Sequence, residues 1–268
     1  MELKHKRVLV TGGSSGIGFA IAEAMAASGA RIVIVGRGET RLSEAAAKLS
    51  AGGNKVDFVA GDVTVDIDRR CILSEAVARL GGLDILVNNA GAVRAGRLEL
   101  ISEADIRAMI EVDLVAPILF VREALPHLRK SGESLVVNIA SAAALTGVPF
   151  YGTYAAAKAG LSRFGEALRR ELKGEGVHVM TVYPVATDTP MMASSKAGAD
   201  LGFGREPAEA VGKAVVEGIE ANAIEVIRGG EARAKAIVLN RENPLALDER
   251  FMSMKAALEE ATRDHRAF

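Results

Sequence analysis

The sequence predicts a single α/β domain whose seven-stranded parallel sheet is doubly wound, with helices on both faces. Seven short apolar runs, rich in β-branched residues, alternate with longer helical patterns, and no linker or low-complexity segment interrupts them. Parallel neighbours need crossover connections, and helices in those connections cover both faces of the sheet. A chain of 268 residues, 49% of them hydrophobic, can bury a core of this size.

The expected strands can be taken in chain order. They are residues 7–11, 31–36, 55–61, 83–88, 134–140, 177–184 and 224–229. Ser102 followed by Asp105 is a capping-box-like pair and predicts the start of a helix. A further helix is expected from about Thr153, because turn formers precede it and a run of alanines comes after it. After the last strand, residues 231–268 carry two helical patterns broken near Pro244, expected to pack outside the sheet or on a partner.

Composition excludes several classes of function. A net charge of -1 gives no reason to expect nucleic acid as a partner. The chain has no apolar run of membrane-spanning length, and the apolar run near its start is too short for a signal peptide. A cytoplasmic protein is therefore expected. Attachment of the tail to a membrane surface stays open. The lone Cys71 is expected to be a small buried residue. The four histidines lack ligand spacing, so no metal site is predicted.

A glycine-rich turn, TGGSSGIG at residues 11–18, lies between the first strand and the first helix. Gly12 permits a tight turn, Gly16 lets the backbone approach a pyrophosphate, and Gly18 allows close contact between helix and strand. The N-terminus of the next helix would face the phosphates. The context therefore indicates a dinucleotide site.

Tyr154 and Lys158 lie four residues apart and would stand on one helix face, roughly 6 Å from each other. An ammonium beside a phenol lowers the phenol's pKa, which suits a general acid or base. Tyr151 is expected in the loop before this helix, so geometry favours Tyr154. An ordinary amphipathic helix with one exposed lysine is the alternative.

Four motifs occur in order between residues 11 and 190: TGGSSGIG, NNAG at 88–91, Ser141 in NIASAAA, and YAAAK at 154–158. Together they resemble the short-chain dehydrogenase/reductase family. The resemblance implies a Rossmann-type sheet, a nicotinamide cofactor and Tyr154 as proton donor or acceptor. It also implies Ser141 as the group that stabilises the carbonyl oxygen, and Lys158 as the residue that holds the nicotinamide ribose and lowers the tyrosine pKa.

The resemblance also places the cofactor. Arg37 comes after the second strand where NAD-preferring relatives have an acidic residue, and its guanidinium can pair with a 2′-phosphate, so NADP(H) is expected. NAD(H) stays possible, since Arg37 could be a solvated loop residue and Ser15 offers no second positive charge. The expected cofactor-binding residues are Gly12, Ser14, Ser15, Gly16, Ile17, Gly18, Arg37, Asp62, Val63, Asn89, Ala90, Gly91, Tyr154, Lys158, Pro184, Thr187 and Thr189.

Two positions depart from the family pattern. Asp113 stands where relatives usually have an asparagine that helps to hold a water linked to the lysine, and its charge would favour the ammonium of Lys158 over the tyrosinate. Asp113 is therefore counted with Ser141, Tyr154 and Lys158 as catalytic, although a tolerated near-isostere is an equal alternative. Val185 replaces the usual glycine after Pro184.

The expected activity is NADP(H)-dependent interconversion of a ketone and a secondary alcohol. A lid at residues 191–206 suggests an adaptable apolar entrance, and 3-oxoacyl, long-chain 3-keto and steroid-like substrates are all compatible. Arg94 and Arg97 either attract an acidic substrate or are solvated. The rival hypothesis is a non-catalytic, NADP(H)-binding sensor that uses the tail to bind a partner. A homodimer or homotetramer, paired through helices near residues 103–130 and 153–173, is expected from the resemblance.

Overall fold

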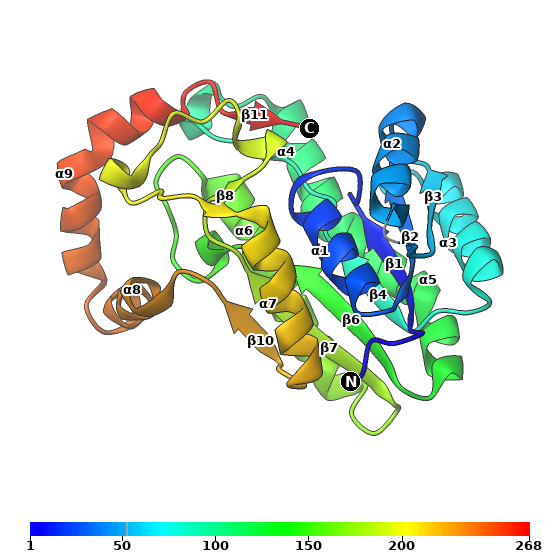
Figure 1. The fold of residues 1–268 in the computed structure, drawn as a ribbon. Coiled ribbons are helices and arrows are strands. Elements are labelled where there is room, and N and C mark those ends of the chain that lie inside the picture. Colours follow the sequence, from blue (N-terminus) through cyan, green and yellow to red (C-terminus); the bar gives the residue numbers. More distant parts are fainter. Residues whose placement is uncertain (52) are drawn as a thin grey trace.

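The computed structural model describes residues 1–51 and 53–268, and a seven-stranded parallel sheet forms its centre (Figure 1). The strand order is β10-β7-β6-β4-β1-β2-β3, so the connections step outward in both directions from β1. All seven predicted strands are present. They are β1 (Arg7–Thr11), β2 (Arg31–Gly36), β3 (Val56–Ala60), β4 (Ile85–Asn88), β6 (Ser134–Ile139), β7 (Val177–Tyr183) and β10 (Glu225–Ile227).

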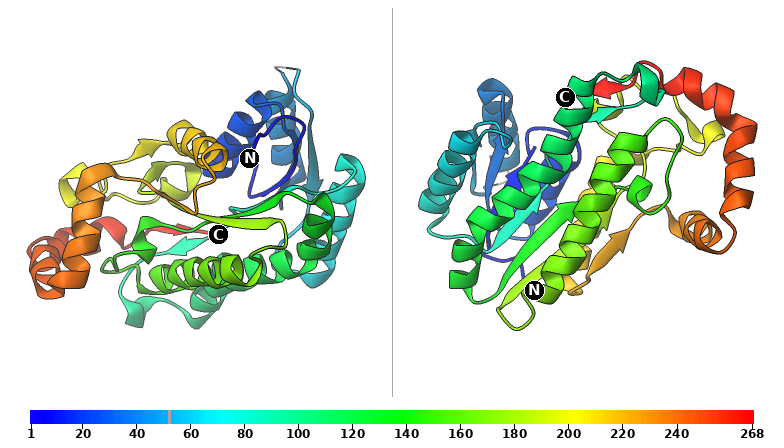
Figure 2. Two further views of the ribbon diagram at one scale, coloured as in Figure 1. Left: turned by 90° about the horizontal axis from the view of Figure 1, so that it is seen from below. Right: turned by 180° about the vertical axis from the view of Figure 1, so that it is seen from behind.

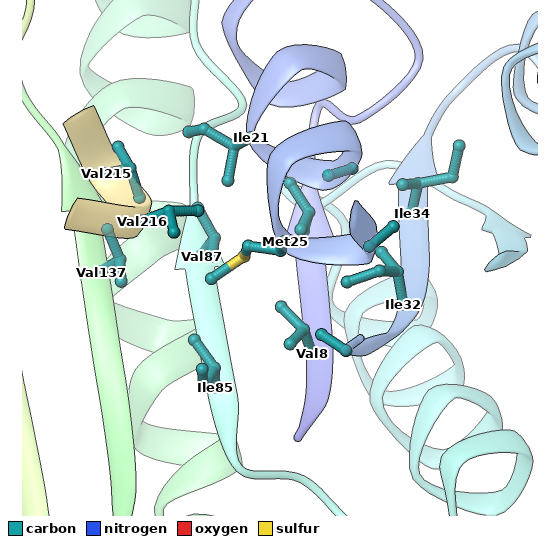
Figure 3. Close-up of a cluster of buried hydrophobic side chains, with 14 of the residues drawn as sticks. Val8, Ile21, Met25, Ile32, Ile34, Ile85, Val87, Val137, Val215 and Val216 are labelled. Carbon is teal, nitrogen blue, oxygen red and sulfur yellow. The ribbon is translucent and has the colours of Figure 1, made fainter. Parts of the chain in front are cut away.

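Helices cover both faces of the sheet, as the views in Figure 2 show. On one face lie α1 (Gly16–Ala27), α2 (Glu39–Ser50) and α7 (Ala208–Glu220); on the other lie α3 (Asp66–Leu80), α5 (Ala116–Ser131) and α6 (Gly152–Glu171). The strands supply apolar residues to both layers. In β1, Val8 faces α1 (Figure 3). Val10 belongs to the same cluster, whereas Leu9 belongs to the opposite layer. Continuous apolar strands therefore bury both faces.

The predicted helix starts are also present. Ser102 caps α4 (Glu103–Ile110), where its side chain accepts a hydrogen bond from the backbone N–H of Asp105. A π-helical segment, η2 (Glu111–Val115), joins α4 to α5. Tyr151 occupies the N-cap position of α6, one residue before Gly152. The prediction of Tyr151 outside the helix and Tyr154 inside it is thus confirmed.

The tail forms two helices, α8 (Gly230–Glu242) and α9 (Pro244–Thr262), separated near Pro244 as the sequence predicted. The chain after α9 was not predicted from the sequence. It forms a short strand, β11 (Arg266–Ala267), which pairs antiparallel with β5 (Val93–Arg94), just beyond the end of β4. The tail therefore folds back over the carboxyl end of the main sheet. A second small pair, β8 (Thr187–Asp188) with β9 (Glu206–Pro207), brackets the expected lid.

The prediction for Cys71 is wrong, because its side chain is exposed. The buried positions of α3 are Arg69, Ile72, Leu73, Ala76 and Leu80, which define one helix face. Residue 71 lies off that face, since successive residues turn by about 100°. Within the part of the chain that the structure describes, no helix is both long and apolar enough to cross a membrane.

Candidate active site

A cavity of about 1390 Å³ lies at the carboxyl ends of β1, β2, β4, β6 and β7. Ligands of open α/β sheets bind at this edge, where the strand order reverses. The volume exceeds the roughly 300–1,000 Å³ of a typical ligand pocket, which leaves room for a dinucleotide and a second molecule. All predicted site residues line the cavity except Gly18 and Asp113.

The glycine turn forms one wall. Gly12 has φ +65°, and a Cβ built on it would lie 2.8 Å from the Nδ2 of Asn89 and 3.0 Å from the Cα of Ala90. Gly18 lies off the cavity, and a Cβ there would lie 2.4 Å from both Asn89 Nδ2 and the Gly12 carbonyl oxygen. Gly18 therefore serves the packing of helix against turn, while Gly12 and Gly16 border the cavity, and a contact of Gly18 with a cofactor stays a prediction.

Thr11, which sequence reasoning missed, holds this wall to the end of β4. Its hydroxyl donates to the carbonyl of Val87 (3.2 Å) and accepts from the backbone N–H groups of Asn89 (2.9 Å) and Ala90 (3.0 Å). The Asn89 amide donates in return to the carbonyls of Thr11 (2.9 Å) and Gly12 (3.2 Å). The Asn89 side chain thus fixes the turn, and its neighbours Ala90 and Gly91 line the cavity.

One end of the cavity, beside β2 and β3, carries two arginines. Arg37 comes directly after β2, and Arg41 lies four residues further on, in the first turns of α2. Across residues 1–51 and 53–268, no carboxylate oxygen lies within 4.0 Å of either guanidinium. Arg41 supplies the second positive charge that Ser15 does not, and its i, i+4 spacing from Arg37 was the available signal.

Asp62 and Val63 border the same end. The Asp62 Oδ1 accepts from the backbone N–H (2.9 Å) and the hydroxyl (2.7 Å) of Thr64, which fixes the loop after β3. The carbonyl of Val63 accepts from Arg69 Nη1 (3.1 Å), a side chain only 2% exposed. The loop after β3 is therefore held in place by hydrogen bonds within the protein.

The predicted catalytic groups come together on the opposite side of the glycine turn. Ser141 lies just beyond the end of β6 and accepts a hydrogen bond from the Ala143 backbone N–H (3.2 Å), so it also caps a short helical turn. Tyr154 and Lys158 lie one turn apart on α6, with the Lys158 Nζ 6.0 Å from the centre of the Tyr154 ring. Ser141, Tyr154 and Lys158 all face the cavity.

Asp113 lies behind Lys158 and does not line the cavity. Its Oδ1 is 3.1 Å from Lys158 Nζ and accepts from the backbone N–H of Ala92 (3.2 Å); Lys158 also donates to the carbonyl of Ile139 (3.0 Å). The side chains of Lys158 and Asp113 are 5% and 0% exposed. Asp113 reaches the site through Lys158 and through the backbone of Ala92, and its assignment as a catalytic residue stays a prediction.

Burial and charge set the pKa values of this group. Burial raises the pKa of Tyr154, the Lys158 ammonium opposes that rise, and the Asp113 carboxylate adds to it. Burial alone would lower the pKa of Lys158, but Asp113 and Tyr154 raise it above its ordinary value. Lys158 is thus held as an ammonium.

Tyr151 forms a wall. Its ring stacks on Phe203, with centroids 6.0 Å apart, and meets His265 of the tail edge-on at 5.9 Å. Burial raises the pKa of Tyr151 to about 12.

Arg94 and Arg97 hold the tail. Arg97 forms a two-pronged ion pair with Glu259 of α9, at 2.5 and 2.8 Å. Arg94 Nη1 donates to the carbonyl of Arg263 (2.7 Å). The Arg97 side chain is also 42% exposed, as the solvated alternative expects, and attraction of an acidic substrate stays a prediction.

Known proteins are similar to this chain in sequence and in fold. The family profile described as short chain dehydrogenase matches residues 6–200. The ketoacyl reductase HetN of Nostoc sp. is 34% identical over 226 residues, which cover 84% of this chain and 79% of that protein. A short chain dehydrogenase from Burkholderia cenocepacia, solved with NADP, superposes with a TM-score of 0.78 at 33% identity, covering 86% of this chain and 98% of the other.

A variant of the actinorhodin polyketide ketoreductase, solved with NADPH, superposes with a TM-score of 0.76 at 26% identity, covering 83% of this chain and 95% of the other. The seven-stranded parallel sheet with helices on both faces agrees with these structural matches. This chain belongs to the short-chain dehydrogenase family of oxidoreductases.

Proposed function

We propose that the protein interconverts a ketone and a secondary alcohol with NADP(H), using Tyr154 as general acid and base. The observation that carries this proposal is the convergence of Ser141, Tyr154 and Lys158 on one cavity with the glycine turn. The motif spacing alone could occur in an inactive relative. A buried, charged group of side chains that faces an open cavity is harder to explain in a protein that catalyses no reaction.

The residues present fit a dinucleotide. At Gly12 and Gly16 the lack of a side chain leaves space that a Cβ would fill. The backbone of the turn leads into the N-terminus of α1, which favours binding of a phosphate. Arg37 and Arg41 would hold a 2′-phosphate, and Asp62 and Val63 would border the adenine. Pro184, Thr187 and Thr189 would border the nicotinamide, which when bound supplies or accepts the hydride.

The chain's own residues would handle charge and the proton. The hydroxyls of Ser141 and Tyr154 would donate hydrogen bonds to the carbonyl oxygen of the ketone, stabilising the negative charge that develops there. Tyr154 would then give its proton to that oxygen in reduction, or remove it in oxidation. Lys158 would stabilise the phenolate that remains, from its fixed place beside Asp113 and the Ile139 carbonyl.

Two observations support NADP(H) as the cofactor. Arg37 and Arg41 both border the adenosine end of the cavity without a carboxylate partner among the described residues. Two solved relatives contain NADP or NADPH. We therefore assign NADP(H) as the preferred cofactor.

The substrate end has apolar walls, formed by Val148, Met191, Met192 and Phe203 together with Leu247, Phe251 and Met254 of α9. These residues suit an extended apolar ketone. The 3-oxoacyl, long-chain 3-keto and steroid-like classes all match this wall, and the similarity to a ketoacyl reductase favours the first.

The test is NADPH oxidation over a panel of 3-oxoacyl thioesters, long-chain 3-keto bases, steroids and cyclic diketones, with Tyr154→Phe as the matched variant. We expect turnover that falls by about 10²- to 10⁴-fold in the variant, because the phenylalanine keeps the ring and removes the proton. Turnover that is equal in both proteins would reject Tyr154 as the acid.

The second candidate is a non-catalytic NADP(H)-binding sensor. The direct Lys158–Asp113 ion pair favours it, since an ammonium neutralised by a carboxylate stabilises a phenolate less well. Tight NADPH binding with no turnover on the whole panel, and a protein partner lost when residues 231–268 are deleted, would support the sensor over the enzyme.

A further inference from the structure

A second pair of arginines lies in the cavity wall, at the end remote from Arg37 and Arg41. Arg233 comes from α8 and Arg250 from α9, and both line the same cavity as Ser141 and Tyr154. The tail helices come after β10, at one edge of the sheet, whereas α2 lies between β2 and β3 at the other edge. Figure 1 shows this separation, with α8 and α9 on the left and α2 on the right.

Arg233 is fixed to the loop that follows Ser141. Its Nη1 donates to the hydroxyl of Thr146 (3.0 Å), a buried residue that lies five positions after Ser141. At its base, Arg233 packs beside Gly229 and Val185. A Cβ at Gly229 would lie 2.8 Å from Val185 Cγ1 and 3.0 Å from the Cβ of Arg233.

The two guanidinium groups lack charge partners. No carboxylate oxygen of the described chain lies within 4.0 Å of Arg233 or Arg250. Three other basic residues of the tail do form ion pairs: Lys235 with Glu231, Arg263 with Glu260 and Arg266 with Asp105.

The surroundings of Arg233 disfavour its charge. Burial is the larger cause and the positive charge of Arg250 the smaller, and both lower the pKa of Arg233. Arg233 is partly buried and Arg250 is exposed, and the two like charges repel each other; a bound anion would offset that repulsion.

We propose that Arg233 and Arg250 bind an acidic group of the substrate, a carboxylate or a phosphate, while its carbonyl lies at Tyr154. This inference rests on the proposed ketone reduction. Guanidinium groups bind both oxyanions through paired N–H donors. The apolar wall between Tyr154 and the two arginines then requires an apolar stretch between the carbonyl and the acidic group of the substrate. The expected substrate class is therefore an acidic ketone, such as an oxo acid or the phosphate ester of an oxo alcohol.

The first experiment measures binding and does not depend on turnover. Octanoate, octyl phosphate and the neutral methyl octanoate are titrated by calorimetry into the full-length protein in the presence of NADP⁺. We expect at least one anion to bind about tenfold or more tightly than the neutral ester, because hydrogen bonds to charged groups are the strong ones. The tighter of the two anions identifies the acidic group.

Arg233→Met and Arg250→Met should each weaken binding of that anion by about 10- to 100-fold and leave the neutral ester unchanged. Because the two arginines are replaced separately, misfolding of one variant still leaves the other as a test. Arg241→Met is the matched control, since Arg241 lies on α8, is exposed and does not line the cavity. Equal affinity for acidic and neutral ligands, no binding of either anion, or an equal loss in Arg241→Met would overturn the inference.

The second experiment measures NADPH oxidation with 7-oxooctanoate and its methyl ester. Arg250→Met should raise KM for the acid by about tenfold or more, with little change in kcat, because the lost contact is remote from the reacting bond. Unequal effects on acid and ester support the anion site. If neither compound nor the wider ketone panel is reduced, the proposed function fails, and the calorimetry still decides the anion site.

Discussion

The carboxylate of Asp113 lies behind Lys158 and does not line the cavity, yet its charge raises the pKa of Tyr154. It fixes the ammonium at 3.1 Å and adds a negative charge near the phenol. Gly91 makes room for this pair, since a Cβ there would lie 2.6 Å from Asp113 Oδ1. In the proposed reaction, Asp113 would therefore influence proton transfer at Tyr154 without lining the cavity.

Asp113→Asn should move the pH dependence to lower pH. Removing the negative charge lowers the pKa of Tyr154, so in oxidation the tyrosinate forms at lower pH, and in reduction the protonated phenol is lost at lower pH. The wild-type protein should therefore have the more alkaline optimum in both directions. Rate profiles of kcat/KM against pH test this, and identical profiles would contradict it.

Arg37→Ala and Arg41→Ala should each weaken binding of NADPH and leave NADH nearly unchanged. A lost pair between guanidinium and phosphate should cost about 10- to 100-fold in NADPH affinity. Fluorescence titration with both nucleotides measures the ratio. Equal losses for NADPH and NADH would mean that these arginines do not contact the 2′-phosphate.

At the scale of elements, a polar clamp joins the starts of the central strands. Asp84 precedes β4 and accepts hydrogen bonds from the backbone N–H (2.7 Å) and Nε (2.8 Å) of Arg7 and from Ser131 (2.5 Å). Burial would raise the pKa of Asp84, but the bonds from Arg7 and Ser131 lower it to about 2. β1, β4 and the end of α5 are held together at the edge opposite the cavity.

Asp84→Asn should destabilise the fold at neutral pH by about 1–2 kcal/mol, discounted for partial exposure to solvent. Because the folded pKa is depressed, this stability is present above the ordinary aspartate pKa near 4 and lost as pH falls toward 2. The variant should show a weaker pH dependence in that window. Urea unfolding at several pH values measures both effects, with the exposed pair of Glu75 and Arg79 as control through Glu75→Gln.

Across the whole molecule, the tail completes the cavity that the sheet begins. The tail is fastened by the pairing of β11 with β5, by Arg97 on Glu259 and by Arg266 on Asp105 (2.9 Å). Its residues His265 and Ala267 line the substrate end, while the glycine turn and Arg37 lie elsewhere in the cavity.

Deleting residues 264–268 should therefore raise KM for the ketone by about tenfold and leave NADPH affinity nearly unchanged. The deletion removes β11 and the His265 contact with Tyr151, so the wall at the substrate end opens to water. Steady-state kinetics and nucleotide titration on one preparation separate the two effects. A parallel loss of NADPH affinity would show that the tail supports the whole cavity.

The sequence by itself determined the seven strands, the glycine turn and the pairing of Tyr154 with Lys158. These features depend on local spacing: apolar runs of strand length, glycines next to a helix start, and residues one helical turn apart. Arg41 could also have been found by its i, i+4 spacing from Arg37.

Only the tertiary structure decided the rest. The direct contact of Asp113 with Lys158 depends on how a π-helical turn presents a side chain to α6, and the contacts of Arg94 and Arg97 depend on where the tail returns. Arg233 and Arg250 are seventeen positions apart on separate helices, a spacing that no local period marks. Such contacts arise from packing between elements distant in the chain, whose positions single-sequence patterns do not encode.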